Sequence, residues 1–214
     1  MLITNYRGKA GHDFMCGRFV IYDEGEIAEI NQILKEVNMK FDGTGIIAKT
    51  GEIFPTNNVP VLTQQAGKPI PTIMKWGFPK WDGKGVIINA KSETAAEKKM
   101  FAKSLIQRRC VIPSNGFYEW AKAEGKTKYR FNVSDTPMLY MAGLYAVFSS
   151  DGQERMPVEN FSILTCAANK SISDIHERMP VILRKDEIVG LLNDFAFACS
   201  IMQRDTVNLI REAV

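Results

Sequence analysis

The sequence has few of the residues that bind metals or form disulfide networks. Of its 214 residues, two are histidines, His12 and His176. Its four cysteines are far apart and include no CxxC pair. Zinc sites need cysteines and histidines at short spacing, and disulfide-stabilised domains need many cysteines. We therefore expect neither a metal site nor a disulfide framework.

The sequence also lacks a long apolar run. No stretch approaches the ~20 apolar residues that cross a bilayer, and the first residues lack the apolar core and cleavage pattern of a signal peptide. We therefore expect a cytoplasmic protein with no membrane association. The net charge of +3 is compatible with an acidic partner but does not require one.

The pattern that is present predicts one α+β domain. The length and the 45% of hydrophobic residues suit one large domain better than two small ones, and no internal repeat or linker marks a boundary. Short apolar segments between turn residues predict a mainly antiparallel sheet, curved or closed into a barrel. These segments are Gly17–Tyr22, Val59–Gln64, Pro71–Trp76, Val86–Asn89, Arg109–Ile112, Tyr129–Val133, Met138–Val147 and Phe161–Cys166.

A few helices are expected to flank this sheet. They are predicted over Glu24–Val37, Ala95–Ile106 and Lys185–Asn193. One face of the first helix holds Ile27, Ile30, Leu34 and Val37. Ser92 or Thr94 is expected to cap the second helix, which would place Glu93 in its first turn. The segment from residue 40 to residue 58 has loop chemistry.

The pair Met15-Cys16 is the most informative place in the sequence, because a methionine before a small residue looks like an alternative start. If Met15 initiates the chain or the preceding peptide is removed, Cys16 carries both a thiol and a free α-amine. Their pKa values are about 8.5 and about 8, and such a 1,2-aminothiol condenses with an aldehyde to a thiazolidine. Taken alone, Cys16 is better interpreted as a small buried side chain, and so are the other three cysteines.

Two further side chains are candidates for proton transfer. His176 lies in a polar turn before Pro180 and either moves protons near neutral pH or is a hydrogen-bonded turn histidine, and the two interpretations are evenly balanced. Glu119 lies between Tyr118 and Trp120, where partial desolvation suits acid–base work. Alternation along the strand slightly favours an outward-facing glutamate instead.

Three more residues have features of a binding site. Asn89 ends an apolar segment and can present its amide to a ligand, and Lys91 follows it closely. Trp81 lies among charged residues, a composition that stacks unpaired bases and contacts phosphate. Trp76 is interpreted as part of the core.

Five segments of the sequence occur in an order that is typical of one family. They are Met15-Cys16-Gly17-Arg18-Phe19, Trp76-Gly77-Phe78, Asn89-Ala90-Lys91-Ser92-Glu93-Thr94, Cys110-Val111-Ile112-Pro113 with Gly116-Phe117-Tyr118-Glu119-Trp120, and His176-Glu177-Arg178-Met179-Pro180. One segment alone is a weak signal, whereas five in order are specific. Together they resemble the SRAP family, the SOS response-associated peptidases or abasic-site processing proteins.

The resemblance implies covalent chemistry on damaged DNA. Cys16 would form a thiazolidine crosslink with abasic sites in single-stranded DNA, while Asn89 would help to position the reacting centre. Glu119 would transfer protons, and His176 would assist the opening of the sugar ring. Autoproteolysis would expose Cys16, and a minor lyase activity would accompany the crosslink. No metal or organic cofactor is implied, and we expect a monomer.

The resemblance also implies the DNA contacts. Arg18, Lys91 and Arg178 would hold backbone phosphates, and Pro55 and Trp81 would pack against bases. The family usually has arginine at the position of Lys91. Lysine keeps the charge but loses bidentate geometry, so we expect weaker phosphate binding there.

The residues before Met15 depart from this scheme. The chemistry needs a free amine on Cys16, yet 14 residues precede Met15. We therefore expect residues 1–14 to be a leader, a tag or a propeptide, and residues 15–214 to form a single SRAP-like domain.

Two other functions stay open. A cysteine peptidase or amidase would use Cys16, His176 and Glu119 as nucleophile, base and orienting group. A binding module would hold single-stranded DNA without a covalent bond, and Cys16 would then have no chemical role. The aldehyde reaction is preferred because it explains the Met15-Cys16 pair together with the later asparagine, glutamate and histidine.

Overall fold

The computed structural model describes most of the chain. It covers residues 16–22, 27–121, 127–148, 158–204 and 207–214. The segment predicted as a leader, tag or propeptide, residues 1–14, lies outside the described residues together with Met15.

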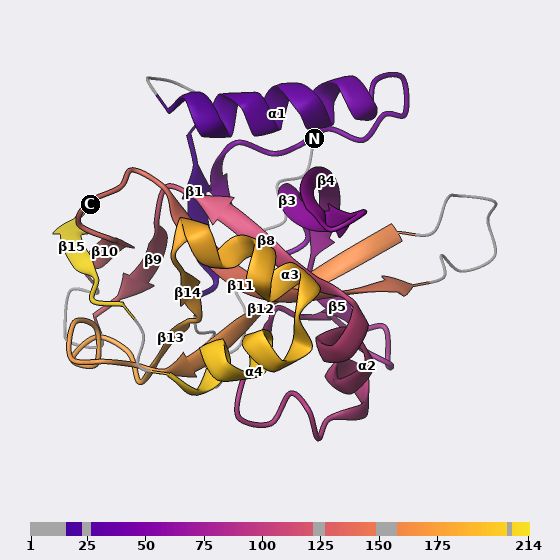
Figure 1. The fold of residues 1–214 in the computed structure, drawn as a ribbon. Coiled ribbons are helices and arrows are strands. Elements are labelled where there is room, and N and C mark those ends of the chain that lie inside the picture. The colour runs from indigo at the N-terminus through magenta and orange to yellow at the C-terminus, as the bar shows by residue number, and fades with distance from the viewer. Residues whose placement is uncertain (1–15, 23–26, 122–126, 149–157, 205–206) are drawn as a thin grey trace.

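Within the described residues, five strands pair in a closed ring. Their order is β3 (Asn58–Gln65), β4 (Lys68–Trp76), β12 (Val158–Ala167), β11 (Leu139–Phe148) and β8 (Arg109–Ser114), which pairs with β3 again. Every pairing is antiparallel except the parallel pairing of β4 with β12. Figure 1 shows these strands in the middle of the molecule. The expected barrel is therefore confirmed, and closure leaves its strands without a long open edge.

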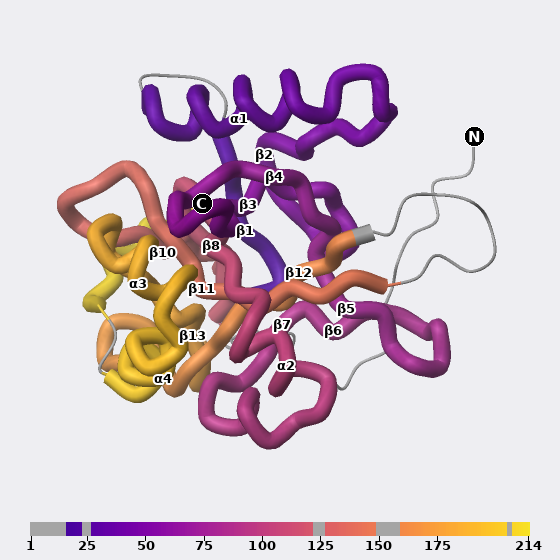
Figure 2. The backbone as a smooth tube through the Cα atoms, turned by 45° about the vertical axis from the view of Figure 1, so that its right-hand side comes forward, coloured from indigo at the N-terminus to yellow at the C-terminus, as the bar shows by residue number. Residues whose placement is uncertain are grey.

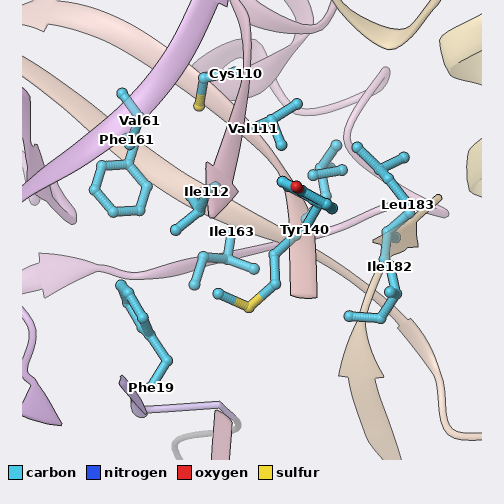
Figure 3. Packing of buried hydrophobic residues seen from close by; sticks show 14 of the residues in the cluster. Phe19, Val61, Cys110, Val111, Ile112, Tyr140, Phe161, Ile163, Ile182 and Leu183 are labelled. Carbon is cyan, nitrogen blue, oxygen red and sulfur yellow. The ribbon is translucent and has the colours of Figure 1, made fainter. Parts of the chain in front are cut away.

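Large aromatic side chains fill one part of the core. Trp76 stacks on Phe161 with the ring centroids 6.3 Å apart, and Phe19 meets Trp76 edge-on at 4.9 Å. All three are fully buried, as predicted for Trp76. The Trp76 Nε1–H group donates to the Ile88 carbonyl at 3.2 Å, so this buried indole keeps a hydrogen bond. Figure 3 shows Phe19 and Phe161 directed toward the same interior as Ile163.

A second, antiparallel sheet lies beside the barrel. Its order is β15 (Ile210–Ala213), β10 (Lys128–Asn132), β9 (Phe117–Trp120), β1 (Arg18–Ile21) and β2 (Gly51–Ile53). Strand β8 leads into β9 across Gly116, whose φ is 138°. A Cβ atom there would lie 2.7 Å from the Phe131 carbonyl oxygen, so only glycine fits this link. The link joins the barrel to the sheet that carries Cys16 and Glu119.

Short strands complete the arrangement around β12. Strands β5 (Phe78–Pro79) and β6 (Val86–Ile87) form a hairpin, and β14 (Ile182–Leu183) pairs with β11. Strand β7 (Asn89–Lys91) is parallel to β12, and β13 (Arg178–Pro180) is antiparallel to it. Thr165 of β12 is the partner of both Lys91 and Pro180. Strands β7 and β13 therefore pair with opposite edges of β12 at this residue.

Four α-helices of the described part pack around the strands. In Figures 1 and 2, α1 (Ala28–Lys40) lies at the top, and α2 (Lys99–Gln107) and α4 (Phe195–Gln203) lie at the bottom. The 3₁₀ turn η1 (Lys185–Glu187) runs into α3 (Ile188–Asn193). Within the described residues, no helix is long and apolar enough to cross a membrane.

The buried Arg109 side chain joins two helix ends. Its Nη1 donates to the Leu105 carbonyl at 2.7 Å, near the end of α2, and its Nε donates to the Leu191 carbonyl at 2.6 Å, near the end of α3. These carbonyls lack partners within their helices, so one cation satisfies both ends.

The start of the second helix was predicted wrongly. Helix α2 begins at Lys99, and residues 92–97 form turns. Neither Ser92 nor Thr94 caps it, and Glu93 does not lie in its first turn. Ala95 is fully buried within those turns, so packing against the core outweighs the helix propensity of the segment.

Several elements were not predicted, and β2, β15 and α4 are examples. Strands β2 and β15 are three and four residues long, and β2 interrupts the segment that was expected to be a loop. Helix α4 reads FAFACSIMQ, which has too few polar residues to reveal a helical period. The apolar face predicted for the first helix is confirmed, with Ile30, Leu34 and Val37 buried.

The barrel depends on a glycine in β11. A Cβ atom on Gly143 would lie 2.6 Å from Ile112 Cδ1 and 3.0 Å from Cys110 Sγ. We expect Gly143→Ala to lower the free energy of unfolding by about 1–3 kcal/mol through overpacking, measured by urea unfolding. Val147→Ala, in the same strand but 42% exposed, is the control and should change it by less than about 0.5 kcal/mol. Equal effects of the two substitutions would contradict this account.

Candidate active site

Cys16 and Glu119 are in direct contact. Strand β1 follows Cys16 and pairs with β9, with Arg18 opposite Tyr118, so the register brings Cys16 beside Glu119. The Cys16 backbone N–H donates to Glu119 Oε1. Cys16 is fully buried, as its structural interpretation predicted, and Glu119 is 4% exposed. The outward orientation that strand alternation favoured for Glu119 is therefore wrong.

The thiol of Cys16 is also close to Glu119. Burial raises the pKa of this thiol well above its usual value, and the charge and a hydrogen bond of Glu119 raise it further. The Arg178 guanidinium acts in the opposite direction. The thiol is therefore protonated at neutral pH in this arrangement, and one carboxylate serves both the nitrogen and the sulfur of the same residue.

The orientation of the His176 ring is set by the chain that follows it. His176 is 7% exposed, and its Nδ1 accepts the backbone N–H of Arg178 at 3.0 Å. A backbone amide can only donate, so Nδ1 presents its lone pair. The neutral imidazole must then carry its proton on Nε2. His176 is therefore hydrogen-bonded beside the turn, and in this tautomer Nε2 is the nitrogen that carries the proton.

Arg178 is enclosed rather than exposed. Its side chain is 11% exposed and pairs with Glu93 through both terminal nitrogens, one of them at 2.7 Å from Oε2. The second nitrogen, Nη2, also donates to the Thr165 carbonyl at 2.8 Å. The hydrogen bond to Arg178 lowers the pKa of Glu93 from 4.5 to about 2. The predicted phosphate ligand therefore already holds an anion from its own chain.

Strand β12 brings the other predicted residues to the same place. Asn89 lies opposite Ile163 and is partly buried, and Lys91 lies opposite Thr165 and is exposed. Arg178 contacts the same Thr165 from the opposite edge. Asn89, Lys91 and Arg178 therefore lie along a short stretch of β12, on the two strands that flank it, although nothing in the sequence predicted that both strands pair with β12.

A cluster of cations and aromatic rings lies on β1, β2, β9 and β10. The Arg18 guanidinium is 3.8 Å from the centroid of Phe54 and 2.9 Å from a Glu52 oxygen. Lys128 Nζ is 3.1 Å from the same Glu52 oxygen and 3.8 Å from the ring centroid of Tyr118. Only Arg18 of this cluster was predicted. Lys128 belongs to no motif, and the signal that pointed here was the aromatic segment around Glu119.

The two residues predicted to pack against bases lie in separate turns. Pro55 is half-buried in the turn between β2 and β3, next to the 41% exposed Phe54. Trp81 lies in the loop between β5 and β6 and is 95% exposed, which confirms its predicted exposure. Within the described residues, no group of three or more His, Cys, Asp or Glu side chains is arranged to hold a metal ion.

Comparisons with known proteins identify a family. The sequence model of the family "SOS response associated peptidase (SRAP)" matches residues 15–203. Abasic site processing protein YoqW of Bacillus subtilis is 32% identical over 187 residues, which cover 84% of this chain and 80% of the relative. Abasic site processing protein YedK of Escherichia coli is 36% identical over 111 residues, covering 50% of this chain and 48% of the relative.

A solved structure shares the fold. A crystal structure of a protein from Bacteroides thetaiotaomicron superposes with a TM-score of 0.76 and 22% identity, covering 93% of this chain and 92% of that chain.

The Glu93–Arg178 pair makes stability depend on pH. The pKa of Glu93 is lowered from 4.5 to about 2, so its contribution is present above pH ~4.5 and is lost as the pH falls toward ~2. We expect Glu93→Gln to lower the free energy of unfolding at pH ~6 and to have a smaller effect at pH ~3, measured by urea unfolding. Half of the Glu93 side chain is exposed, so solvent screening keeps the effect modest. An identical effect at both pH values would contradict this prediction.

Proposed function

Because the chain belongs to the SOS response associated peptidase (SRAP) family, we propose that it processes abasic sites in single-stranded DNA by bonding Cys16 to the open sugar. Relatives that match most of the chain are named abasic site processing proteins. The observation that carries the proposal is the hydrogen bond between the Cys16 nitrogen and Glu119. It puts an acid–base group on the atom that must lose protons in such a reaction.

The reaction requires a free amine. While Met15 is attached, the Cys16 nitrogen belongs to a peptide bond whose lone pair is delocalised onto the carbonyl, so it cannot attack an aldehyde. In this proposal residues 1–14 are a leader, tag or propeptide that is lost together with Met15, through cleavage by the protein itself. The remaining residues form the SRAP domain, and its first residue is Cys16.

The chemistry then follows in two steps. The Cys16 amine adds to C1′ of the open aldehyde, and the aldehyde oxygen leaves as water with the two protons of the amine, which gives a Schiff base. The thiol then adds to C1′, and its proton moves to the nitrogen, which closes the thiazolidine ring. Holding the amine, thiol and aldehyde together makes both steps effectively intramolecular.

Glu119 fits both proton transfers. It contacts the nitrogen that loses protons in the first step and the thiol that gives one in the second. The raised thiol pKa is compatible with this order, because the sulfur reacts second and brings its own proton. If ring closure fails, loss of a proton beside the Schiff base leads to strand cleavage, which accounts for the proposed minor lyase activity.

His176 and Asn89 have supporting roles in this proposal. With its proton on Nε2, His176 can donate a hydrogen bond to the sugar ring oxygen and favour the open form. Asn89 would orient the open sugar from β7. No metal or organic cofactor takes part.

DNA binding would rest on phosphates and stacked bases, without sequence readout. Arg18 and Lys128, together with their aromatic neighbours, form one contact region. Lys91, Arg178, Pro55 and Trp81 are proposed as further contacts. The protein is proposed to act as a monomer in the cytoplasm, as part of the DNA damage response.

A peptidase that acts on other proteins is less well supported by the same site. In a cysteine–histidine pair, one imidazole nitrogen accepts the thiol proton while the other donates to an orienting group. The Nδ1 of His176 accepts instead of donating.

The crosslink itself can be tested directly. We expect protein that begins at Cys16 to give a heat-stable shifted band with a single-stranded oligonucleotide that contains one abasic site, on a denaturing gel. The full chain with an uncleaved Met15 should give no such band, because it lacks the free amine. Cys16→Ala should give none either, because it lacks the thiol. An oligonucleotide with intact bases is the control. A heat-stable band with Cys16→Ala would refute the role of Cys16.

The position of the proton on His176 can also be tested. Protein that begins at Cys16 lacks His12, so His176 is its only histidine, and its two ring nitrogens can be assigned without ambiguity. We expect nitrogen NMR of histidine-labelled protein at neutral pH to show the proton on Nε2 and a bare Nδ1. A proton on Nδ1 would remove the argument against the peptidase mechanism. This measurement needs no DNA.

A further inference from the structure

Arg178 has two kinds of partner, one fixed and one at the surface. The Thr165 carbonyl belongs to the barrel strand β12 and accepts from Arg178 Nη2 at 2.8 Å. Glu93 instead belongs to the turns of residues 92–97, and half of its side chain is exposed. Glu93 therefore covers the outward side of a guanidinium whose own side chain is only 11% exposed.

Glu93 does not have the role that its sequence position suggested, which was to lie in the first turn of the second helix. It lies outside α2 and so does not complement the dipole of that helix. The exposed Lys91 lies two residues before it, and its positive charge also lowers the pKa of Glu93. One carboxylate thus pairs with Arg178 and feels the charge of Lys91, and these two cations lie on the two strands that flank Thr165.

A carboxylate and a phosphate present the same feature to arginine. Each offers two oxygens that match the fork of a guanidinium. Without Glu93 the Arg178 guanidinium, whose side chain is 11% exposed, would keep its hydrogen bond to the Thr165 carbonyl but lose its ionic partner. Release of Glu93 is therefore favoured when another anion takes the same place. A DNA phosphate at this position would replace one anion by another and leave Arg178 paired throughout.

We propose that Glu93 sets the affinity for DNA. Its carboxylate binds the side of the Arg178 guanidinium to which a backbone phosphate of single-stranded DNA binds. This inference rests on the proposed function, since it assumes that single-stranded DNA lies along β7, β12 and β13. Each binding event then includes the displacement of Glu93 from Arg178. Glu93 weakens binding and restricts it to strands whose phosphate reaches this position.

Salt dependence separates this exchange from simple charge neutralisation. When a phosphate binds a cation, counterions of the DNA are released. When the same phosphate displaces Glu93, the displaced carboxylate recovers a counterion, so the release is cancelled in part. Removal of the Glu93 charge should therefore make log affinity fall more steeply with log salt, by about 0.7 for one phosphate on a single strand.

The experiment compares two substitutions that change the net charge equally. Glu93→Gln removes the carboxylate on Arg178, and Glu97→Gln removes an exposed carboxylate four residues later in the sequence. Affinity for a single-stranded oligonucleotide with intact bases, which cannot be crosslinked, is measured over a range of salt in protein that begins at Cys16. Glu93→Ser is a second variant with a smaller side chain, and circular dichroism checks that each variant is folded.

We expect Glu93→Gln to bind more tightly than wild type, on the order of tenfold at low salt, with a salt slope steeper by about 0.7. Glu97→Gln should stay close to wild type. If Glu93→Gln and Glu93→Ser bind no more tightly than Glu97→Gln, the exchange is refuted, and salt-dependent binding by wild type still supports the proposed function.

A second probe makes failure of the inference distinct from failure of the proposed function. Tripolyphosphate is titrated against the same proteins, with the shift in melting temperature as the measurement. We expect a larger shift for Glu93→Gln than for wild type or Glu97→Gln. If wild type binds no DNA but Glu93→Gln binds both the oligonucleotide and tripolyphosphate more strongly than wild type does, the DNA function is refuted and the anion exchange is retained. No gain on either probe refutes the exchange.

Discussion

The structure depends on strand β12, because both edges of this strand pair with other strands. One edge pairs with β11 and then with β13, and the other pairs with β4 and then with β7. Its first half closes the barrel, and its second half carries Asn89, Lys91 and Arg178 to one place. The same backbone therefore holds the fold and positions the candidate site, so displacement of β12 would disturb both.

The site combines two carboxylates in different environments. Glu119 is buried and contacts the backbone nitrogen and thiol of Cys16. Glu93 is half-exposed and pairs with Arg178, which keeps its pKa far below the usual value. A buried carboxylate beside a nitrogen can exchange protons, whereas an ionised carboxylate on an arginine can only hold or release a cation. The two glutamates are therefore suited to different tasks within a few strands of each other.

Much of the fold could be predicted from local pattern. Apolar segments and turn residues indicated most of the barrel strands, and helical spacing indicated the buried face of α1. Helix α4 could not be recognised, because a nearly uniform apolar segment has no period. The late start of α2 could not be recognised either, because it goes with the burial of Ala95 in the hydrophobic core, which the local sequence does not specify.

The candidate site was predicted as residue types, without its connections. Motifs indicated Cys16, Glu119 and His176, but no spacing in sequence shows that Glu119 contacts the Cys16 nitrogen or that Glu93 covers Arg178. Lys128 has no motif at all and joins the site only through the pairing of β9 with β10. Pairings between distant segments depend on the closed fold, which a single sequence does not specify position by position.

The backbone of Cys16 is in the left-handed region, with φ at 46°. This conformation costs a residue with a side chain about 1–2 kcal/mol, because the chain on either side crowds Cβ. The angle φ is defined by the carbonyl carbon of the preceding residue, and an N-terminal residue has no such atom. Removal of Met15 would therefore abolish this torsion and the strain that goes with it, while the hydrogen bond to Glu119 could stay. If Met15 is lost as proposed, the folded state would therefore favour the chain that begins at Cys16.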